Sequence, residues 1–156
     1  MRNSSKATLV TPLLSGLAGA IVLTFIHETA RRTVDEAPRM DTMGRRALAQ
    51  GLEAVGIEPP PHDELQALAL AGDIVSNTIY YALVGVGSAE HALLRGAVLG
   101  GAAGIGAVVL PPYYLGLGRR PRGVTPRTKA MTFAWYLAGG LAAGAAYRGL
   151  AAMQRL

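Results

Sequence analysis

Residues 7–26 read ATLVTPLLSGLAGAIVLTFI, an apolar stretch without a formal charge between Lys6 and His27. A helix of about 20 residues crosses the roughly 30 Å of hydrocarbon in a bilayer. A cleaved signal sequence also begins with basic residues, but its apolar core is usually only about 7–15 residues long. We therefore expect residues 7–26 to form a retained transmembrane helix.

Three later stretches have the same apolar character. They cover residues 65–89, 96–118 and 130–147. Pro111 and Pro112 interrupt the middle one, so its helix should stop or kink at Leu110, because proline lacks an amide donor and restricts the residue before it. The sequence predicts an all-α, integral-membrane four-helix bundle that forms one domain over residues 1–156.

The composition agrees with a membrane location. Of the 156 residues, 51% are hydrophobic and 16% are charged, whereas soluble domains carry about 25% charged residues. The absence of cysteine excludes disulfides, thiolate nucleophiles and cysteine-ligated metals. The net charge of +5 is better explained by basic loops at a membrane than by nucleic-acid binding, because the basic residues are not interleaved with aromatic ones. We expect the lipid bilayer, and no nucleic acid, as a partner.

A polar loop, residues 27–64, separates the first two spans. Within it, Asp41 is placed to cap a helix from about residue 42 to 55. Leu48, Leu52 and Val55 recur at helical spacing in that helix, which makes it amphipathic. Such a helix either lies on the membrane surface or packs as a cap over the end of the bundle.

Counts of lysine and arginine give the expected orientation. The loops 27–64 and 119–129 lie on one side of a four-span bundle and together hold ten of these residues, against five on the other side. Cytoplasmic loops of membrane proteins are enriched in lysine and arginine. We therefore expect both loops in the cytoplasm and both termini outside.

Small residues repeat every four positions in two of the expected spans. The glycines of this pattern, here called the glycine zipper, are Gly96, Gly100, Gly104, Gly140 and Gly144. Glycine faces let another backbone approach closely, and close packing drives helix association in lipid. The partner helix belongs either to the same chain or to another subunit.

Polar residues inside spans are costly in hydrocarbon and mark functional positions. Asp73 lies within residues 65–89, and Ser76, Asn77 and Tyr80 follow it in a polar stripe. Three roles fit a carboxylate at this place: a structural hydrogen-bonding group, a proton or cation site, or a contact for a substrate or cofactor.

His27 and Glu28, together with His62, form a nitrogen and carboxylate set that occurs in metal sites. Ion pairs explain the same residues without a metal, because Glu28 precedes Arg32 by one helical turn. The chain contains no phosphate-binding, nucleophile-elbow, dinucleotide or zinc-protease motif. The sequence therefore favours a non-enzymatic function and predicts no cofactor.

Several features together resemble a known family. They are Gly16–Ala20 in the first span, the prolines 59–61, Pro111-Pro112 after a glycine-rich span, Trp135-Tyr136 and Arg148. In this arrangement the chain resembles the YagU-like family of uncharacterised bacterial inner-membrane proteins. The resemblance implies a bacterial inner membrane and a stress-related role, and it transfers no site residues.

These patterns predict a small integral-membrane subunit that packs through glycine-rich faces, as a homo-oligomer or as an accessory component of a larger membrane complex. The alternative is a proton- or ion-linked transporter or channel centred on Asp73 and Asn77. A third hypothesis, an intramembrane enzyme or metal protein that uses His27 and Glu28, has the least support in the sequence.

Overall fold

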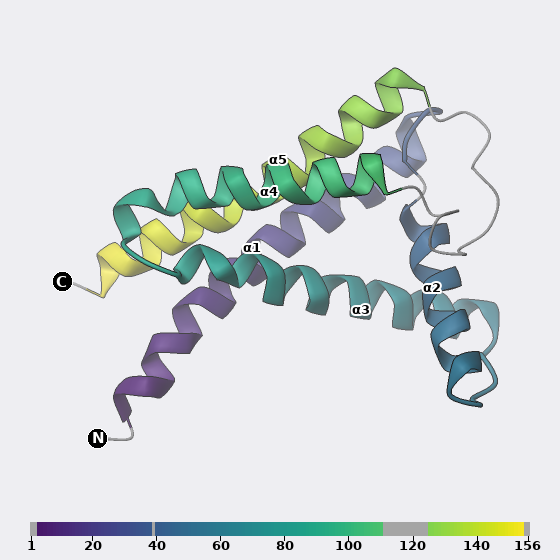
Figure 1. Cartoon of the computed structure of the whole chain (residues 1–156), viewed down its shortest axis with the longest axis horizontal. Coiled ribbons are helices and arrows are strands. Elements are labelled where there is room, and N and C mark those ends of the chain that lie inside the picture. The colour runs from purple at the N-terminus through teal and green to yellow at the C-terminus, as the bar shows by residue number, and fades with distance from the viewer. Residues whose placement is uncertain (1–2, 39, 111–124, 155–156) are drawn as a thin grey trace.

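The computed structural model describes residues 3–38, 40–110 and 125–154 (Figure 1). These residues form helices and contain no strand. Two short 3-10 helices, η1 (Ala82–Gly85) and η2 (Ala89–His91), join α3 to α4. The five α-helices are α1 (Asn3–Thr33), α2 (Met40–Ala54), α3 (His62–Tyr81), α4 (Ala92–Val109) and α5 (Pro126–Met153). The all-α prediction is confirmed for this part of the chain.

Four of the helices run along the length of the molecule, while α2 lies across one end (Figure 1). The start of α1 and the end of α5 lie near the turn between α3 and α4, where Gln154 Nε2 donates to Thr11 Oγ1 at 2.6 Å. At the opposite end, Thr125 Oγ1 donates to Glu36 Oε2 at 2.8 Å. We call this second end, which carries α2, the loop end.

Three segments of the described chain are long and apolar enough to cross a membrane. They are Leu9–Thr33, His62–Gly85 and Ala89–Val109. The fourth expected span, residues 130–147, lies within the 28-residue helix α5. That helix is not among the three segments named above. The chain is thus a multi-span membrane protein by its helix composition, and a fourth span remains a prediction.

The surface of the molecule is apolar over the lengths of its helices. Large hydrophobic side chains are widely exposed, among them Phe25 at 69% on α1, Ile79 at 61% on α3 and Val98 at 62% on α4. Among the described residues, the fully buried hydrophobic cluster is small and consists of Leu23, Tyr81, Val84 and Ala143. Apolar area of this extent on the outside of a helical protein is typical of lipid-facing surface.

The glycine zipper lies between α4 and α5. All five of its glycines are buried there. A Cβ atom on Gly96 would overlap the carbonyl oxygen of Gly140, and a Cβ atom on Gly100 would lie 2.6 Å from the carbonyl oxygen of Tyr136. In this structure the glycine zipper therefore joins two helices of one chain.

The ends of the spans differ in part from the expected positions. α4 ends at Val109 and Leu110 follows as its C-cap, as the proline pair predicts. Residues 111–118 of the third expected span, and residues 119–124 of the following loop, lie outside the described residues. The second expected span ends early, because the chain turns at Gly87, whose φ of 107° is a conformation that residues with a side chain avoid.

The expected loop helix is present as α2, Met40–Ala54, which covers residues 42–54 of the predicted helix. Asp41 lies in the first turn of α2 and is not its N-cap, because the helix already starts at Met40, the residue before Asp41. α2 packs against α3, where a Cβ atom on Gly44 would lie 3.8 Å from the Ala69 side chain. Leu48 and Leu52 of the expected apolar stripe are half-buried, whereas Val55 lies beyond the end of α2 and is 70% exposed. Of the two expected placements, the structure shows the cap over the end of the bundle.

Candidate functional site

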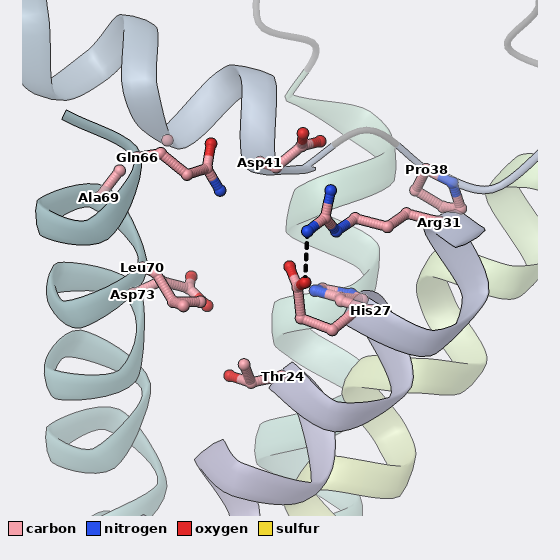
Figure 2. A pocket seen from close by; sticks show the side chains of 11 residues that line it. Thr24, His27, Arg31, Pro38, Asp41, Gln66, Ala69, Leu70 and Asp73 are labelled. Carbon is pink, nitrogen blue, oxygen red and sulfur yellow. Dashed lines mark hydrogen bonds and ion pairs between the residues drawn. The ribbon is translucent and has the colours of Figure 1, made fainter. Parts of the chain in front are cut away.

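A cavity lined by both polar and apolar groups lies at the loop end, between α1, α2 and α3 (Figure 2). Its volume is about 50 Å³. The lining side chains that carry polar groups are Thr24, His27, Glu28 and Arg31 on α1, Asp41 on α2, and Gln66 and Asp73 on α3. Figure 2 shows Asp73 across from Thr24 and His27, with Gln66, Asp41 and Arg31 nearer the top of the view. We call this space the polar cavity.

Helical spacing explains why these residues meet. On α1, the four lining residues occupy positions i, i+3, i+4 and i+7 from Thr24, which places them on one face of the helix. On α3, the lining residues follow the same spacing from Gln66 through Ala69 and Leu70 to Asp73. Two helix faces of equal length thus oppose each other, and α2 covers the space between them.

Three of the cavity's charged groups, Glu28, Arg31 and Asp41, lie in ion pairs. The Arg31 guanidinium donates to Glu28 Oε2, and Arg32 Nη2 lies 3.4 Å from the same oxygen. Arg45 Nη2 lies 4.0 Å from Asp41 Oδ2. Each pair lies within one helix, the first two in α1 and the third in α2, and partly balances the charge of Glu28 or Asp41.

Asp73 has a different kind of partner. Asn77 Nδ2 donates to Asp73 Oδ1 at 3.0 Å and to the Asp73 carbonyl oxygen at 2.9 Å. The amide of Asn77 is neutral, so this contact orients the carboxylate without balancing its charge.

Unpartnered polar atoms are concentrated around the polar cavity. Among the described residues, six buried side-chain nitrogen or oxygen atoms have no hydrogen-bond partner. Five of the six belong to lining residues: Thr24 Oγ1, His27 Nε2, Arg31 Nε, Asp41 Oδ1 and Gln66 Oε1. A buried polar atom without a partner costs about 1–3 kcal/mol, so a cluster of them indicates that the site is built to contact something other than the protein.

The size of the polar cavity limits what fits in it. A cavity needs roughly 10–15 Å³ of such space to hold one water molecule, so a cavity of about 50 Å³ has room for water. That volume suits water, a proton or a small cation.

Helix α5 forms the aromatic side of the site. The His27 ring lies 5.2 Å from the Trp135 ring and 5.8 Å from the Tyr136 ring, measured between ring centres. Deeper in the bundle, the Tyr81 hydroxyl donates to the carbonyl oxygen of Tyr136 at 2.9 Å, beside buried Leu23. His27 therefore lies between a polar cavity on one side and aromatic rings on the other.

The expected polar stripe on α3 is divided. Asp73 lines the polar cavity and Asn77 supports it. Ser76 is exposed and donates to the Asp73 carbonyl oxygen at 3.1 Å. The Tyr80 hydroxyl instead joins α3 to α4, donating to the carbonyl oxygen of Leu99 at 2.8 Å. Of these four residues, Asp73 and Asn77 belong to the site, and the other two have contacts of their own.

The structure does not bring the three expected metal ligands together. His27 and Glu28 line the polar cavity, but His62 lies at the exposed start of α3, with its Nε2 2.6 Å from Arg45 Nη1. Within the described ranges, no group of three or more histidine, aspartate or glutamate side chains is placed to hold a metal ion.

Sequence reasoning missed Thr24 and Gln66 as members of the site and assigned Asp41 only a capping role. The signal was present, since polar residues recur at helical spacing at the end of one span and the start of the next. Spacing alone does not show that the two faces oppose each other, because that depends on how α2 turns the chain.

Comparison with known proteins gives no assignment for this chain. No protein-family model, curated protein or solved structure matches it. The resemblance to the YagU-like family therefore stays a prediction, and the site has to be interpreted from its own geometry.

Proposed function

We propose that this multi-span membrane protein takes up a proton or a small cation in the polar cavity, with Asp73 as the central acid. The observation that carries the proposal is the cluster of five unpartnered polar atoms around a cavity of about 50 Å³. Transport of that ion, as a transporter or channel, is the function this site supports best.

Charge balance favours a cation over an anion. Glu28 is paired with Arg31 and Asp41 lies beside Arg45, which leaves the Asp73 carboxylate with the neutral Asn77 amide. An uncompensated carboxylate in the membrane-spanning part of a protein is costly. A bound proton or cation removes that cost, and the polar cavity gives it room.

The location of the polar cavity indicates from which side of the membrane the ion enters it. It lies at the loop end, where the arginine-rich connection between α1 and α3 folds over the bundle. By the rule that basic loops face the cytoplasm, we place the loop end in the cytoplasm and both chain termini outside, in a bacterial inner membrane. The ion then enters from the cytoplasmic side.

Flux through reconstituted protein tests this proposal. Liposomes that contain the purified protein and an internal pH dye are given a proton gradient, and separate samples are given a sodium or potassium gradient. We expect the wild type to conduct one of these ions above protein-free liposomes, and Asp73→Asn to lose that flux, because the amide neither ionises nor releases a proton. A matched control is Asp63→Asn, which changes an exposed aspartate in the first turn of the same helix.

Two results contradict the proposal. One is wild-type flux no faster than in protein-free liposomes for every ion tested. The other is equal flux in Asp73→Asn and the wild type.

A role as a subunit of a homo-oligomer or larger complex is the second candidate. The glycine zipper is used within the chain, so another subunit needs a different face. The outer face of α3 is available for such a contact. Nothing lies within 4 Å of a Cβ atom built on Gly72, and Leu68 and Val75 on the same helix are exposed.

Native mass spectrometry of protein extracted in mild detergent tests this candidate. Oligomers or stoichiometric foreign subunits support it, and a bare monomer contradicts it.

A further inference from the structure

The unpartnered atoms around the polar cavity are of two opposite kinds. Arg31 Nε is a hydrogen-bond donor, whereas Asp41 Oδ1 and Gln66 Oε1 are acceptors. Thr24 Oγ1 can act as either, and His27 Nε2 donates in the neutral tautomer that carries its hydrogen there. All five atoms are buried, and none makes a direct hydrogen bond to another. A ligand of this cavity therefore has to accept hydrogen bonds and also to donate them.

Water is the small ligand that does both. A metal cation binds only to acceptors and is repelled by the Arg31 guanidinium, while an anion binds only to donors and is repelled by the Asp41 carboxylate. A buried water molecule makes about three hydrogen bonds and bridges polar atoms that are too far apart to bond directly. The cavity volume of about 50 Å³ is several times the roughly 10–15 Å³ needed to hold one water molecule.

We infer that internal water fills the polar cavity and connects Asp73 with the solution at the loop end, and that the ion which reaches Asp73 is therefore a proton. This inference rests on the proposed function and narrows it, since hydrogen-bonded water passes protons while the mixed set of donors and acceptors does not suit a metal ion. Thr24 and Gln66 are positioning residues, because they act by holding the water.

The lining residues are arranged along the path that this inference requires. Thr24 lies about two helical turns before Arg31 on α1, and Asp73 lies about two turns after Gln66 on α3. Figure 2 accordingly shows Thr24 and Asp73 further from α2 than Arg31 and Gln66. At the end near α2, the side chains of Arg31 and Glu28 are 30% and 25% exposed, so this end of the cavity reaches the surface of the molecule.

The chemical steps are proton transfers without oxidation or reduction. Hydronium at the loop end gives a proton to the neighbouring water molecule and becomes water. Each water molecule in turn passes on one proton, and the last one gives a proton to a carboxylate oxygen of Asp73. The carboxylate becomes a neutral acid, and release of the proton reverses these steps.

Water-edited NMR of the full-length protein in nanodiscs tests the hydration of the cavity without any transport. This experiment detects the side chains that receive magnetisation from nearby water. Leu70 lines the polar cavity, whereas Leu68 lies on the exposed outer face of the same helix, where lipid covers it. We expect strong transfer from water to Leu70 and little to Leu68, which is the matched control in the same sample.

Variants test the two positioning residues. The double variant Thr24→Val/Gln66→Leu removes the hydroxyl and the amide, so it should lose the transfer to Leu70 and most of the proton flux in liposomes. Thr24→Ser keeps the hydroxyl and should retain both. Thr29→Val makes the same substitution at an exposed threonine of α1 and should also retain both. If the double variant fails to fold, the comparison of Leu70 with Leu68 in the wild type still decides the question.

Three results overturn the inference. They are equal transfer to Leu70 and Leu68 in the wild type, unchanged transfer to Leu70 in the folded double variant, and an Asp73-dependent flux of sodium or potassium without a flux of protons. The last result leaves the proposed function intact. Transfer from water to Leu70 in a protein that conducts no ion contradicts the proposed function alone.

Discussion

Single glycine residues set the distance between α4 and α5. Gly96 and Gly140 face each other so closely that a methyl group on either would overlap the backbone of the opposite helix. Gly106, also on α4, has no such role, since nothing lies within 4 Å of a Cβ atom built on it. The same residue type is therefore essential at one position and replaceable ten residues later.

This contrast predicts the effect of adding one methyl group. Gly96→Ala should lower the free energy of unfolding by about 1–3 kcal/mol, the usual cost of overpacking, because the backbone of α5 has to move away. Gly106→Ala on the same helix is the control and should leave stability unchanged or slightly higher, since alanine is the better helix former. Unfolding in mixed detergent and SDS measures both variants. Equal stabilities would show that α4 and α5 do not pack through these glycines.

At the scale of elements, α2 decides whether the polar cavity exists. It supplies Asp41 and covers the space between α1 and α3. It is short, and the chain leaves it at Gly56, whose φ is 79°. There the Gly56 amide donates to the Glu53 carbonyl oxygen at 3.0 Å and the Ile57 amide to the Leu52 carbonyl oxygen at 2.9 Å, which completes the last turn.

Two glycines in this region should respond in opposite directions to the same change. Gly51→Ala lies inside α2 with nothing within 4 Å, so it should stabilise the helix by up to about 1 kcal/mol. Gly56→Ala forces a side chain into a left-handed conformation and should destabilise it by about 1–2 kcal/mol. Hydrogen exchange of residues 40–57 checks this, because protection should rise in the first variant and fall in the second. A change in the same direction for both would contradict the described end of α2.

At the scale of the whole molecule, the lengths of the apolar segments in the sequence predict where the long helices lie, because crossing a bilayer requires long apolar segments. The helical class, the stop before Pro111 and the loop helix were all predictable for this reason. Only some residues of the polar cavity were predicted from the sequence. Asp73 was assigned to one candidate site, and His27 and Glu28 were assigned to another. Their meeting depends on the angle between α1 and α3, which packing sets and which no local pattern contains.

The central claim is that four spans form a bundle with the polar cavity at one end. Single-cysteine labelling tests it most directly, since the chain has no cysteine of its own. The suitable exposed positions are Glu58→Cys between α2 and α3, Glu90→Cys in η2 and Met153→Cys at the end of α5. Each variant is treated in sealed membrane vesicles with a maleimide that does not cross the membrane.

We predict that Glu58→Cys is labelled from one side of the membrane, and that Glu90→Cys and Met153→Cys are labelled from the other. Labelling of Met153→Cys from the same side as Glu58→Cys would show that α5 does not cross. That result would contradict the four-span bundle on which the proposed ion pathway depends.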